Sequence, residues 1–496
     1  TFAWTKDYTP IKVEKLSYPY GEVNLAFEGN TFSALEVFKS TTNFDNLLEM
    51  IIQQSELYMT QKGKPFTISK DELSAFLGIN IVMGYHILPN LRDYWSTSVD
   101  LQVPYIANVM TRKRFEEIRD ALHFNDNEKK RESNSDRAFK VRSLIKHFNE
   151  SFQAAREPSK KQSIDEHMIK FKGHNAMKQY IRNKPIKWGF KMWCRCDSTN
   201  GYLYEFDMYQ GKKEDPNHGL GEGVVLTLTK SLEGLACEVF FDNFFNNPNL
   251  QKKLLAKGIY ACGTCQSNRK NMPKNLLSDK NMKRGDIDYR VAENVSCVKW
   301  MDSRSVLLLS NYISPLDTVK VSRRQSGTAA KIQVDCPTMV KNYNTYMGGV
   351  DLMDQNASYY GSDRRSRMKY YLRIFFDLLD ISVKNACIIY NQMIEKDGPS
   401  GFKKLSSLQY RQEIARGLIA DFSMRHRETP VVRNTGVPGK VASHLIIRSD
   451  KRKRCVRCYK AGRDIKIDTK CETCNVYLCF TQSRNCFRDY HKDAIK

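Results

Sequence analysis

The sequence predicts an α+β protein of several domains, with helices first, a mixed sheet next and a cysteine-rich segment last. Three observations support this fold class. Apolar residues recur at helical spacing up to about residue 155 and alternate at strand spacing from residue 162. Six of the 14 cysteines fall between residues 455 and 486. A chain of 496 residues with 41% hydrophobic residues can bury several cores.

The charge of the chain points to a polyanionic partner. The formal net charge of +24 favours nucleic acid, with an anionic membrane as the weaker alternative. The most apolar window, residues 73–88, contains Ser74, Asn80 and His86 and is too short to span a bilayer, so we expect no membrane partner. No signal-peptide pattern opens the chain, and its start at Thr1 rather than Met leaves room for a removed leading segment. The six cysteines between residues 455 and 486 are therefore expected to bind metal in a reducing compartment.

Helices are predicted for most of residues 1–160, after an extended segment of about 40 residues. Ser69 and Glu72 form a capping box that opens an apolar helix, and Thr111 caps another. Helical spacing indicates helices at 44–55, 69–83, 111–122 and 138–155.

Strand patterns then replace the helical ones. Strands are predicted at 162–171, 188–196, 202–207 and 237–241, with a helix at 224–232 before the last. Strand-strand-strand-helix-strand is the order of a ribonuclease-H-like domain, whose chemistry is done by carboxylates gathered from separated positions. Asp165 lies within the first strand, Asp242 directly after the fourth, and Asp351 on a later predicted helix.

Gly348 and Gly349 precede that later helix, on which Asp351 and Asp354 lie three residues apart and share one face. The glycine pair can act as a hinge. Three or four carboxylates can hold the two Mg²⁺ ions that clamp an in-line phosphoryl transfer. The alternatives are a surface strand residue, a turn starter and a helix cap for Asp165, Asp242 and Asp351 respectively.

Four segments resemble, in order, the core motifs of piggyBac-family transposases: Ile164–Gly173, Asn183–Lys191, Phe241–Phe245 and Met347–Gln355. The resemblance implies that Asp165, Asp242 and Asp351 form a catalytic DDD triad on magnesium, with Asp354 as an additional required Asp. It implies a nuclear, dimeric enzyme that nicks transposon ends, forms hairpins and joins DNA to TTAA targets. The alternative is a domesticated, non-enzymatic nuclear DNA-binding or chromatin protein.

The resemblance also implies a domain order. We expect a helical dimerisation and DNA-binding domain (1–160 and 361–440), a catalytic core (161–268 and 338–360), an insertion domain (269–337), a basic linker (441–454) and a zinc-binding domain (455–496).

Cations near the carboxylates and before the cysteines are candidate phosphate contacts. The alternative is that they are solvated, with the interleaved aromatic residues in the core. The candidates are Lys184, Lys187, Lys191, Arg364, Arg365, Arg367, Lys369, Arg373, Lys451, Arg452, Lys453 and Arg454. The last four can also serve as a nuclear-localisation signal.

The cysteine-rich end carries two C-x-x-C steps separated by 12 residues, a strong zinc pattern. A cross-braced module with two structural Zn²⁺ is predicted, although the wide step from Cys479 to Cys486 leaves the ligand pairing open. A RING-type ligase module is a weaker alternative, since the spacing fits it poorly. The predicted ligands are Cys455, Cys458, Cys471, Cys474, Cys479, Cys486 and His491, with His444 or water as the eighth. Cys262 and Cys265 have no second pair nearby and are interpreted as structural thiols.

Overall fold

The structure is a computed structural model that describes residues 2–27, 31–129, 136–182, 184–211, 219–325, 330–362, 368–398, 402–424, 444–481 and 483–493. The chain forms two compact units, Thr1–Met424 and Arg425–Lys496. Among the described residues, no helix combines the length and apolar character needed to cross a lipid bilayer.

The first unit begins with helices, as predicted. They are α1 (Ala34–Thr42), α2 (Phe44–Gln61), α3 (Lys70–Tyr85), α4 (Pro104–Ala107), α5 (Arg112–Ala121) and α6 (Arg142–Ala155), with short 3₁₀ turns η2 (Leu91–Trp95) and η4 (Phe139–Val141). The sequence missed α1, although Ser33 and Glu36 form a complete capping box at its start.

The predicted caps of α3 and α5 are present, but at α3 the carboxylate of Glu72, the second residue of the predicted capping box, binds Arg114. The Ser69 hydroxyl accepts the Glu72 N–H at 3.1 Å, and the Thr111 hydroxyl accepts the Arg114 N–H at 3.3 Å. The Glu72 carboxylate accepts two hydrogen bonds from the Arg114 guanidinium, at 2.7 and 2.8 Å. This charged pairing holds α3 against α5.

A mixed sheet follows α6. Its strands and helices are β1 (Lys161–Lys170), β2 (Lys178–Tyr180), β3 (Trp188–Asp197), β4 (Leu203–Met208), α7 (Leu220–Leu228), η5 (Lys230–Leu232), β5 (Glu238–Phe241), α8 (Pro248–Ala256) and β6 (Tyr260–Thr264). β3 pairs antiparallel with β1, β2 and β4, whereas β5 is parallel to β1 and β6 is parallel to β5. All four predicted strands are confirmed. The three residues of β2 were too few to predict.

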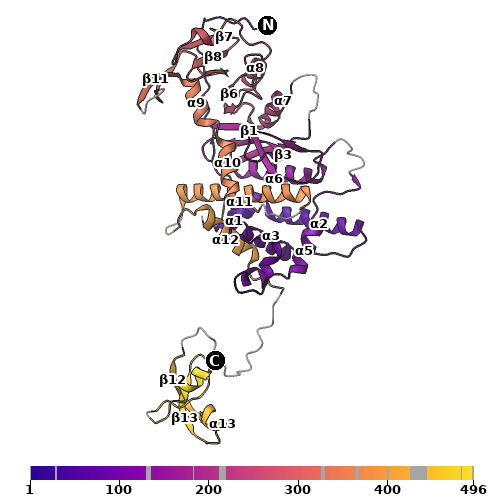
Figure 1. Cartoon of the computed structure of the whole chain (residues 1–496), viewed down its shortest axis with the longest axis vertical. Helices are drawn as coiled ribbons and strands as arrows, with labels where there is room; N and C mark the ends of the chain where they lie inside the picture. The colour runs from indigo at the N-terminus through magenta and orange to yellow at the C-terminus, as the bar shows by residue number, and fades with distance from the viewer. Residues whose placement is uncertain are drawn as a thin grey trace. The chain divides into compact units, whose positions relative to one another are not determined.

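The segment after β6 extends the same sheet. Strands β7 (Ile287–Ala292), β8 (Val295–Met301) and β9 (Ser305–Ser310) form a meander, and β9 pairs with β6, giving the order β2-β3-β1-β5-β6-β9-β8-β7. The 3₁₀ turn η6 (Asp279–Asn281) precedes them, and β10 (Thr318–Arg324) pairs with β11 (Lys331–Pro337) in a separate hairpin. The N-terminal segment reaches this end of the unit, where Thr5 bridges Val291 (Figure 1).

The chain then crosses back to the helices through α9 (Thr338–Tyr346), α10 (Gly349–Ser358), α11 (Tyr370–Asp397) and α12 (Ser407–Ile419). α10 packs on β1 and β3, α11 contacts α1, and α12 contacts α3 (Figure 1). The helical layer therefore combines helices that precede the sheet in the chain with helices that follow it.

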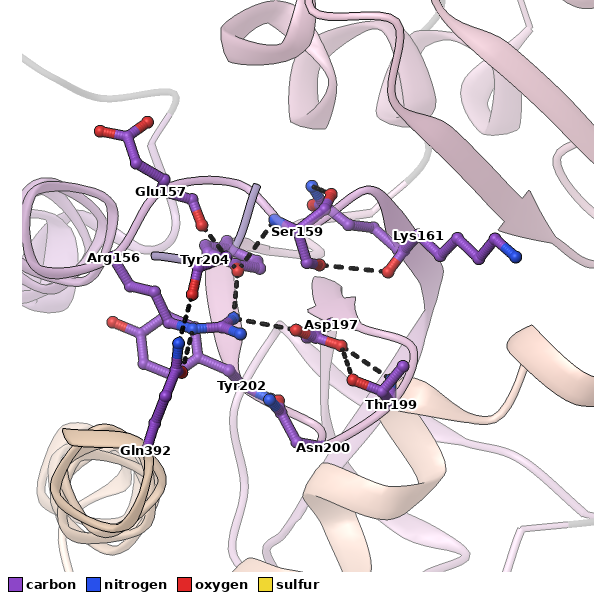
Figure 2. A network of polar contacts seen from close by, with 12 residues as sticks. Arg156, Glu157, Ser159, Lys161, Asp197, Thr199, Asn200, Tyr202, Tyr204 and Gln392 are labelled. Carbon is purple, nitrogen blue, oxygen red and sulfur yellow. Dashed lines mark hydrogen bonds and ion pairs between the residues drawn. The ribbon is translucent and has the colours of Figure 1, made fainter. Parts of the chain in front are cut away.

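A buried polar network joins that helical layer to the sheet (Figure 2). The Arg156 guanidinium, at the end of α6, donates to Asp197 Oδ2 at 2.9 Å and to Gln392 Oε1 of α11 at 3.0 Å. Asp197 also accepts from the Thr199 backbone and hydroxyl at 2.7 and 2.6 Å. The Arg156–Asp197 ion pair is almost fully buried, so the loss of either side chain would leave an uncompensated buried charge on the other.

The second unit contains β12 (Ile446–Arg454), α13 (Val456–Lys460), β13 (Lys466–Cys471) and α14 (Cys486–Asp493). The interpretation of residues 441–454 as a linker is wrong for its second half, because the basic run Lys451–Arg454 lies in β12. Lys453 and Arg454 pair with Ile467 and Lys466 of β13. Arg454 also donates to Asp464 at 2.8 Å, and these cross-strand contacts explain why a run of cations adopts strand structure.

Candidate active site and metal centres

Asp165 lies on β1, and Asp242 directly follows β5, the neighbouring parallel strand. The register pairs Ile164 of β1 with Phe241 of β5, and each aspartate is the next residue along its strand. Residues at matching positions of adjacent parallel strands point to the same side of a sheet. Asp242 therefore follows the end of β5 beside the position of Asp165 on β1.

The start of α10 packs on the face of β1 that carries Ser163, because Gly349 has no side chain to keep it away. A methyl group at Gly349 would lie 2.5 Å from Ser163 Oγ and 2.6 Å from the Asp197 carbonyl oxygen. Ser163 and Asp165 are two apart on β1 and share a face. Asp351, in the first turn of α10, is thereby brought to the Asp165 side of the sheet and is exposed.

One helical turn further, Asp354 is held by His167. The buried His167 ring makes hydrogen bonds through Nδ1 to Asp354 and through Nε2 to Asp377 Oδ2 of α11, the latter at 2.9 Å. Burial opposes the charged ring, but the two carboxylates outweigh it and raise the pKa of His167 well above its ordinary value. A protonated imidazole donates through both ring nitrogens, so each carboxylate accepts one hydrogen bond from His167.

Two lysines neutralise part of this negative charge. Lys184 Nζ and Lys191 Nζ lie 3.7 and 3.8 Å from the Glu166 carboxylate. Burial disfavours the Lys184 ammonium, but Asp165, Glu166, Asp351 and Asp354 together raise its pKa. Burial lowers the pKa of Lys191, against the attraction of Glu166, Asp165 and Asp242. Each of the four predicted aspartates thus acts on at least one of these two lysines.

Asp165 and Asp242 are partly buried, and burial opposes their ionisation. Burial, reinforced by Glu166, raises the pKa of Asp165 to about 8, and burial raises the pKa of Asp242. Hydrogen bonds from the backbone of Glu166 and Phe244, at 2.7 and 2.9 Å, oppose these shifts. Carboxylates packed so that they resist ionisation gain most from a bound cation.

A cavity of about 660 Å³ opens beside the end of β1 and α10. Its charged lining includes His167, Lys184, Asp351, Asp354 and Asp377. The cavity gives Asp351 and Asp354 direct access from outside.

The carboxylates fit hard divalent cations, which prefer oxygen ligands. Asp165, Asp242 and Asp351 would hold such ions, and the open arrangement leaves room for a substrate. They do not form a closed ligand set: among the described residues, the groups whose ligand atoms all lie within 4.8 Å of one another are two cysteine clusters.

The cations predicted to contact DNA lie in different surroundings. Lys187 is exposed, Lys369 Nζ donates to the Asp120 carbonyl oxygen at 2.8 Å, and Arg373 lines the cavity. Arg364, Arg365 and Arg367 lie outside the described residues. The role of these cations in DNA binding stays a prediction.

The second unit brings its eight predicted ligands into two groups. Cys458 Sγ lies 3.7 Å from Cys479 Sγ and 3.6 Å from Cys486 Sγ, and Cys474 Sγ lies 3.3 Å from His444 Nδ1 and 3.6 Å from His491 Nε2. One group is Cys455, Cys458, Cys479 and Cys486, and the other is His444, Cys471, Cys474 and His491. The groups alternate along the chain, as a cross-brace requires.

The chemistry of both groups fits tetrahedral Zn²⁺. His491 Nδ1 donates to the Phe487 carbonyl oxygen at 2.7 Å, which leaves Nε2 with its lone pair toward the cysteines. His444 lies in the second group and offers it a fourth ligand atom. In contrast, the thiols of Cys262 and Cys265 are buried in different apolar clusters of the first unit.

Acidic side chains on a mixed sheet, followed by a cysteine-rich unit with two candidate metal groups, are the features to compare with known proteins. The family model described as Transposase IS4 matches residues 42–387. Among curated human proteins, PiggyBac transposable element-derived protein 2 is 32% identical over 464 residues, covering 90% of this chain and 74% of the relative. PiggyBac transposable element-derived protein 3 is 30% identical over 468 residues with the same coverage.

The chain therefore belongs to the piggyBac transposase family. Among solved structures, a cryo-EM structure of a piggyBac transposase synaptic complex with hairpin DNA has the same fold, with a TM-score of 0.70 and 23% identity. The match covers 92% of this chain and 98% of that one.

Sequence reasoning missed three residues of the site: Glu166, His167 and Asp377. Glu166 and His167 adjoin Asp165, but strand alternation treats Glu166 as facing away. His167 lies two positions from Asp165 and so on its face, a signal that was available. Asp377 lies in a 28-residue helix whose packing no local pattern reveals.

Proposed function

We propose that this protein is a DDD transposase that cuts and joins DNA at transposon ends by phosphoryl transfer. The observation that carries the proposal is the register that sets Asp165 and Asp242 directly after the paired residues Ile164 and Phe241, together with the close contact of Gly349 with Ser163 that brings the first turn of α10, with Asp351, to β1. The order β4-β3-β1-β5-β6 within the sheet supports a ribonuclease-H-like core.

In this mechanism, the side chains supply position and charge. Asp165, Asp242 and Asp351 offer oxygens at the reacting phosphate, and His167 with Asp377 holds Asp354 one turn from Asp351. Lys184 and Lys191 offset the carboxylate charge when a phosphate approaches. Two Mg²⁺ ions, when bound, would activate the attacking oxygen and stabilise the leaving one.

The family relationship supports the remaining details. These are hairpin intermediates, TTAA target sites, a homodimer on paired ends, a nuclear location and DNA binding by the zinc-containing second unit. The solved relative was captured as a synaptic complex with hairpin DNA. The charge of residues 451–496, with 13 Lys and Arg against 5 Asp and Glu, suits a phosphate partner.

One reaction tests the proposal. Purified protein is incubated with Mg²⁺ and candidate TTAA-flanked end DNA from its own source genome, and the products are resolved on a denaturing gel. Nicked strands and hairpins are expected. Binding without products would contradict the enzymatic proposal and favour a non-enzymatic descendant. The human relatives are named as transposable element-derived proteins, which is consistent with that alternative.

A further inference from the structure

Two large aromatic side chains lie on the surface of the β2–β3 hairpin. Tyr180 is 51% exposed and Trp188 is 50% exposed. They are directly opposite in the antiparallel register, with ring centroids 4.7 Å apart. Tyr and Trp are enriched at interfaces, because each combines a large apolar ring with a polar group.

The hairpin holds these rings outward because other residues anchor it. Phe190, two positions after Trp188, is fully buried and stacks on Phe171 at 4.8 Å. Gly189 lies so close to β1 that an added methyl group would lie 2.1 Å from the Ile169 carbonyl oxygen. Phe190 and Gly189 thus anchor the strand to its neighbours while about half of each outer ring stays exposed.

The surroundings of the pair are cationic. Lys178 Nζ lies 5.0 Å from the Trp188 ring centroid, and Lys172, Arg182 and Lys187 are exposed on the same segment. From His167 to Cys196 the chain has six lysines and two arginines and neither Asp nor Glu. Exposed aromatic faces amid cations are the features with which proteins bind single-stranded nucleic acid.

The same hairpin reaches the candidate active site. Lys184, in the turn between β2 and β3, lies against Glu166. Along β1, the residue opposite Gly189 is Lys170, five positions from Asp165. That distance is about 17 Å, the length of about five stacked nucleotides.

We propose that Tyr180 and Trp188 form a stacking platform for unpaired bases of the DNA strand held at the carboxylate site. The inference rests on the proposed function and specifies where the strand lies. The partner is single-stranded DNA, recognised through base faces and phosphates and not through base edges.

Tryptophan fluorescence gives a local readout. Of the five tryptophans, all within the described residues, only Trp188 is exposed. The full chain is titrated with oligothymidylate of about 12 nucleotides, with an abasic oligomer of equal length, and with duplex DNA. Stacked thymines should quench the emission, the abasic strand should bind without this quench, and Trp188→Phe should remove the quenching signal.

Affinity gives the second readout. Trp188→Ala and Tyr180→Ala should each weaken oligothymidylate binding about tenfold and change duplex binding less than about twofold. The matched control is Tyr105→Ala, which removes another exposed aromatic ring and should change neither affinity.

Three outcomes would overturn the platform. They are equal oligothymidylate affinity in wild type and Trp188→Ala, equal quenching by the abasic strand, and loss of self-association in Trp188→Ala with unchanged DNA affinity. Failure of the wild-type protein to bind any DNA, duplex included, would instead contradict the proposed function, and the platform with it.

Discussion

Gly349 of α10 lies directly against Ser163 of β1, with no room between them for a side chain. An added methyl group would come within 2.5 Å of Ser163 Oγ, a distance that real Cβ atoms do not adopt. This contact brings the helix that carries Asp351 onto the face that carries Asp165. The glycine pair was predicted to act as a hinge, but Gly349 serves close approach and has a normal helical backbone.

Gly349→Ala should therefore displace α10. We expect a loss of about 2 kcal/mol in unfolding free energy and a fall in strand cleavage of about a hundredfold. Denaturant unfolding and a cleavage assay measure the two effects. Gly348→Ala is the matched control, because an added methyl group there meets nothing within 4 Å. Equal behaviour of the two variants would contradict the role of the contact.

His167 should matter through Asp354. His167→Leu removes the shared donor and leaves Asp354 and Asp377 facing each other, so we expect about 2 kcal/mol lower stability and cleavage as low as that of Asp354→Ala. Asp377→Asn keeps an oxygen acceptor for Nε2 and should be milder. Cleavage by folded His167→Leu at the wild-type rate would show that Asp354 does not need this support.

The second unit should bind two zinc ions per chain. Cys455→Ser and His444→Ala each remove a ligand from a different group, so each should lower the zinc content from two to one, measured by elemental analysis. Cys265→Ala, outside both groups, should retain both ions. Two ions in His444→Ala would remove His444 from the ligand set.

His123 should make the first unit less stable in acid. Burial, with help from Lys140, lowers its pKa to about 4, and its neutral ring stacks on Tyr58 at 4.2 Å. In the unfolded chain, His123 binds a proton as the pH falls below its ordinary pKa of about 6.5. In the folded protein it stays neutral until about pH 4. Stability therefore falls as the pH drops through this window, by about 2 kcal/mol from pH 7 to pH 5.

Urea unfolding at both pH values checks this effect. His123→Phe keeps a ring on Tyr58 but cannot titrate, so its stability should fall by about 2 kcal/mol less than that of the wild type. The same pH-dependent loss in both proteins would contradict the assignment to His123.

The sequence was informative where patterns are local. Alternation located β1, β3 and β4, a short buried run located β5, and caps located α3 and α5. Cysteine spacing predicted the two zinc groups, although their pairing emerged only from the fold, because spacing alone does not determine which thiolates meet. The position of Asp165 within its strand was likewise predictable.

Non-local contacts were not predictable from local patterns. The pairing of β6 with β9 joins the expected insertion to the main sheet, and no pattern in either strand specifies that partner. The basic run at Lys451–Arg454 looked like a solvated linker, yet contacts with β13 make it a strand. His167 meets Asp377 across 210 positions of sequence.

The central claim is that Asp351 acts with Asp165 and Asp242 in cutting DNA. The most direct test compares wild type and Asp351→Asn on TTAA-flanked end DNA with Mg²⁺, at matched DNA occupancy. The account predicts nicked and hairpin products from the wild type, and equal binding without products from the variant. Retained cleavage by Asp351→Asn at that occupancy would contradict it.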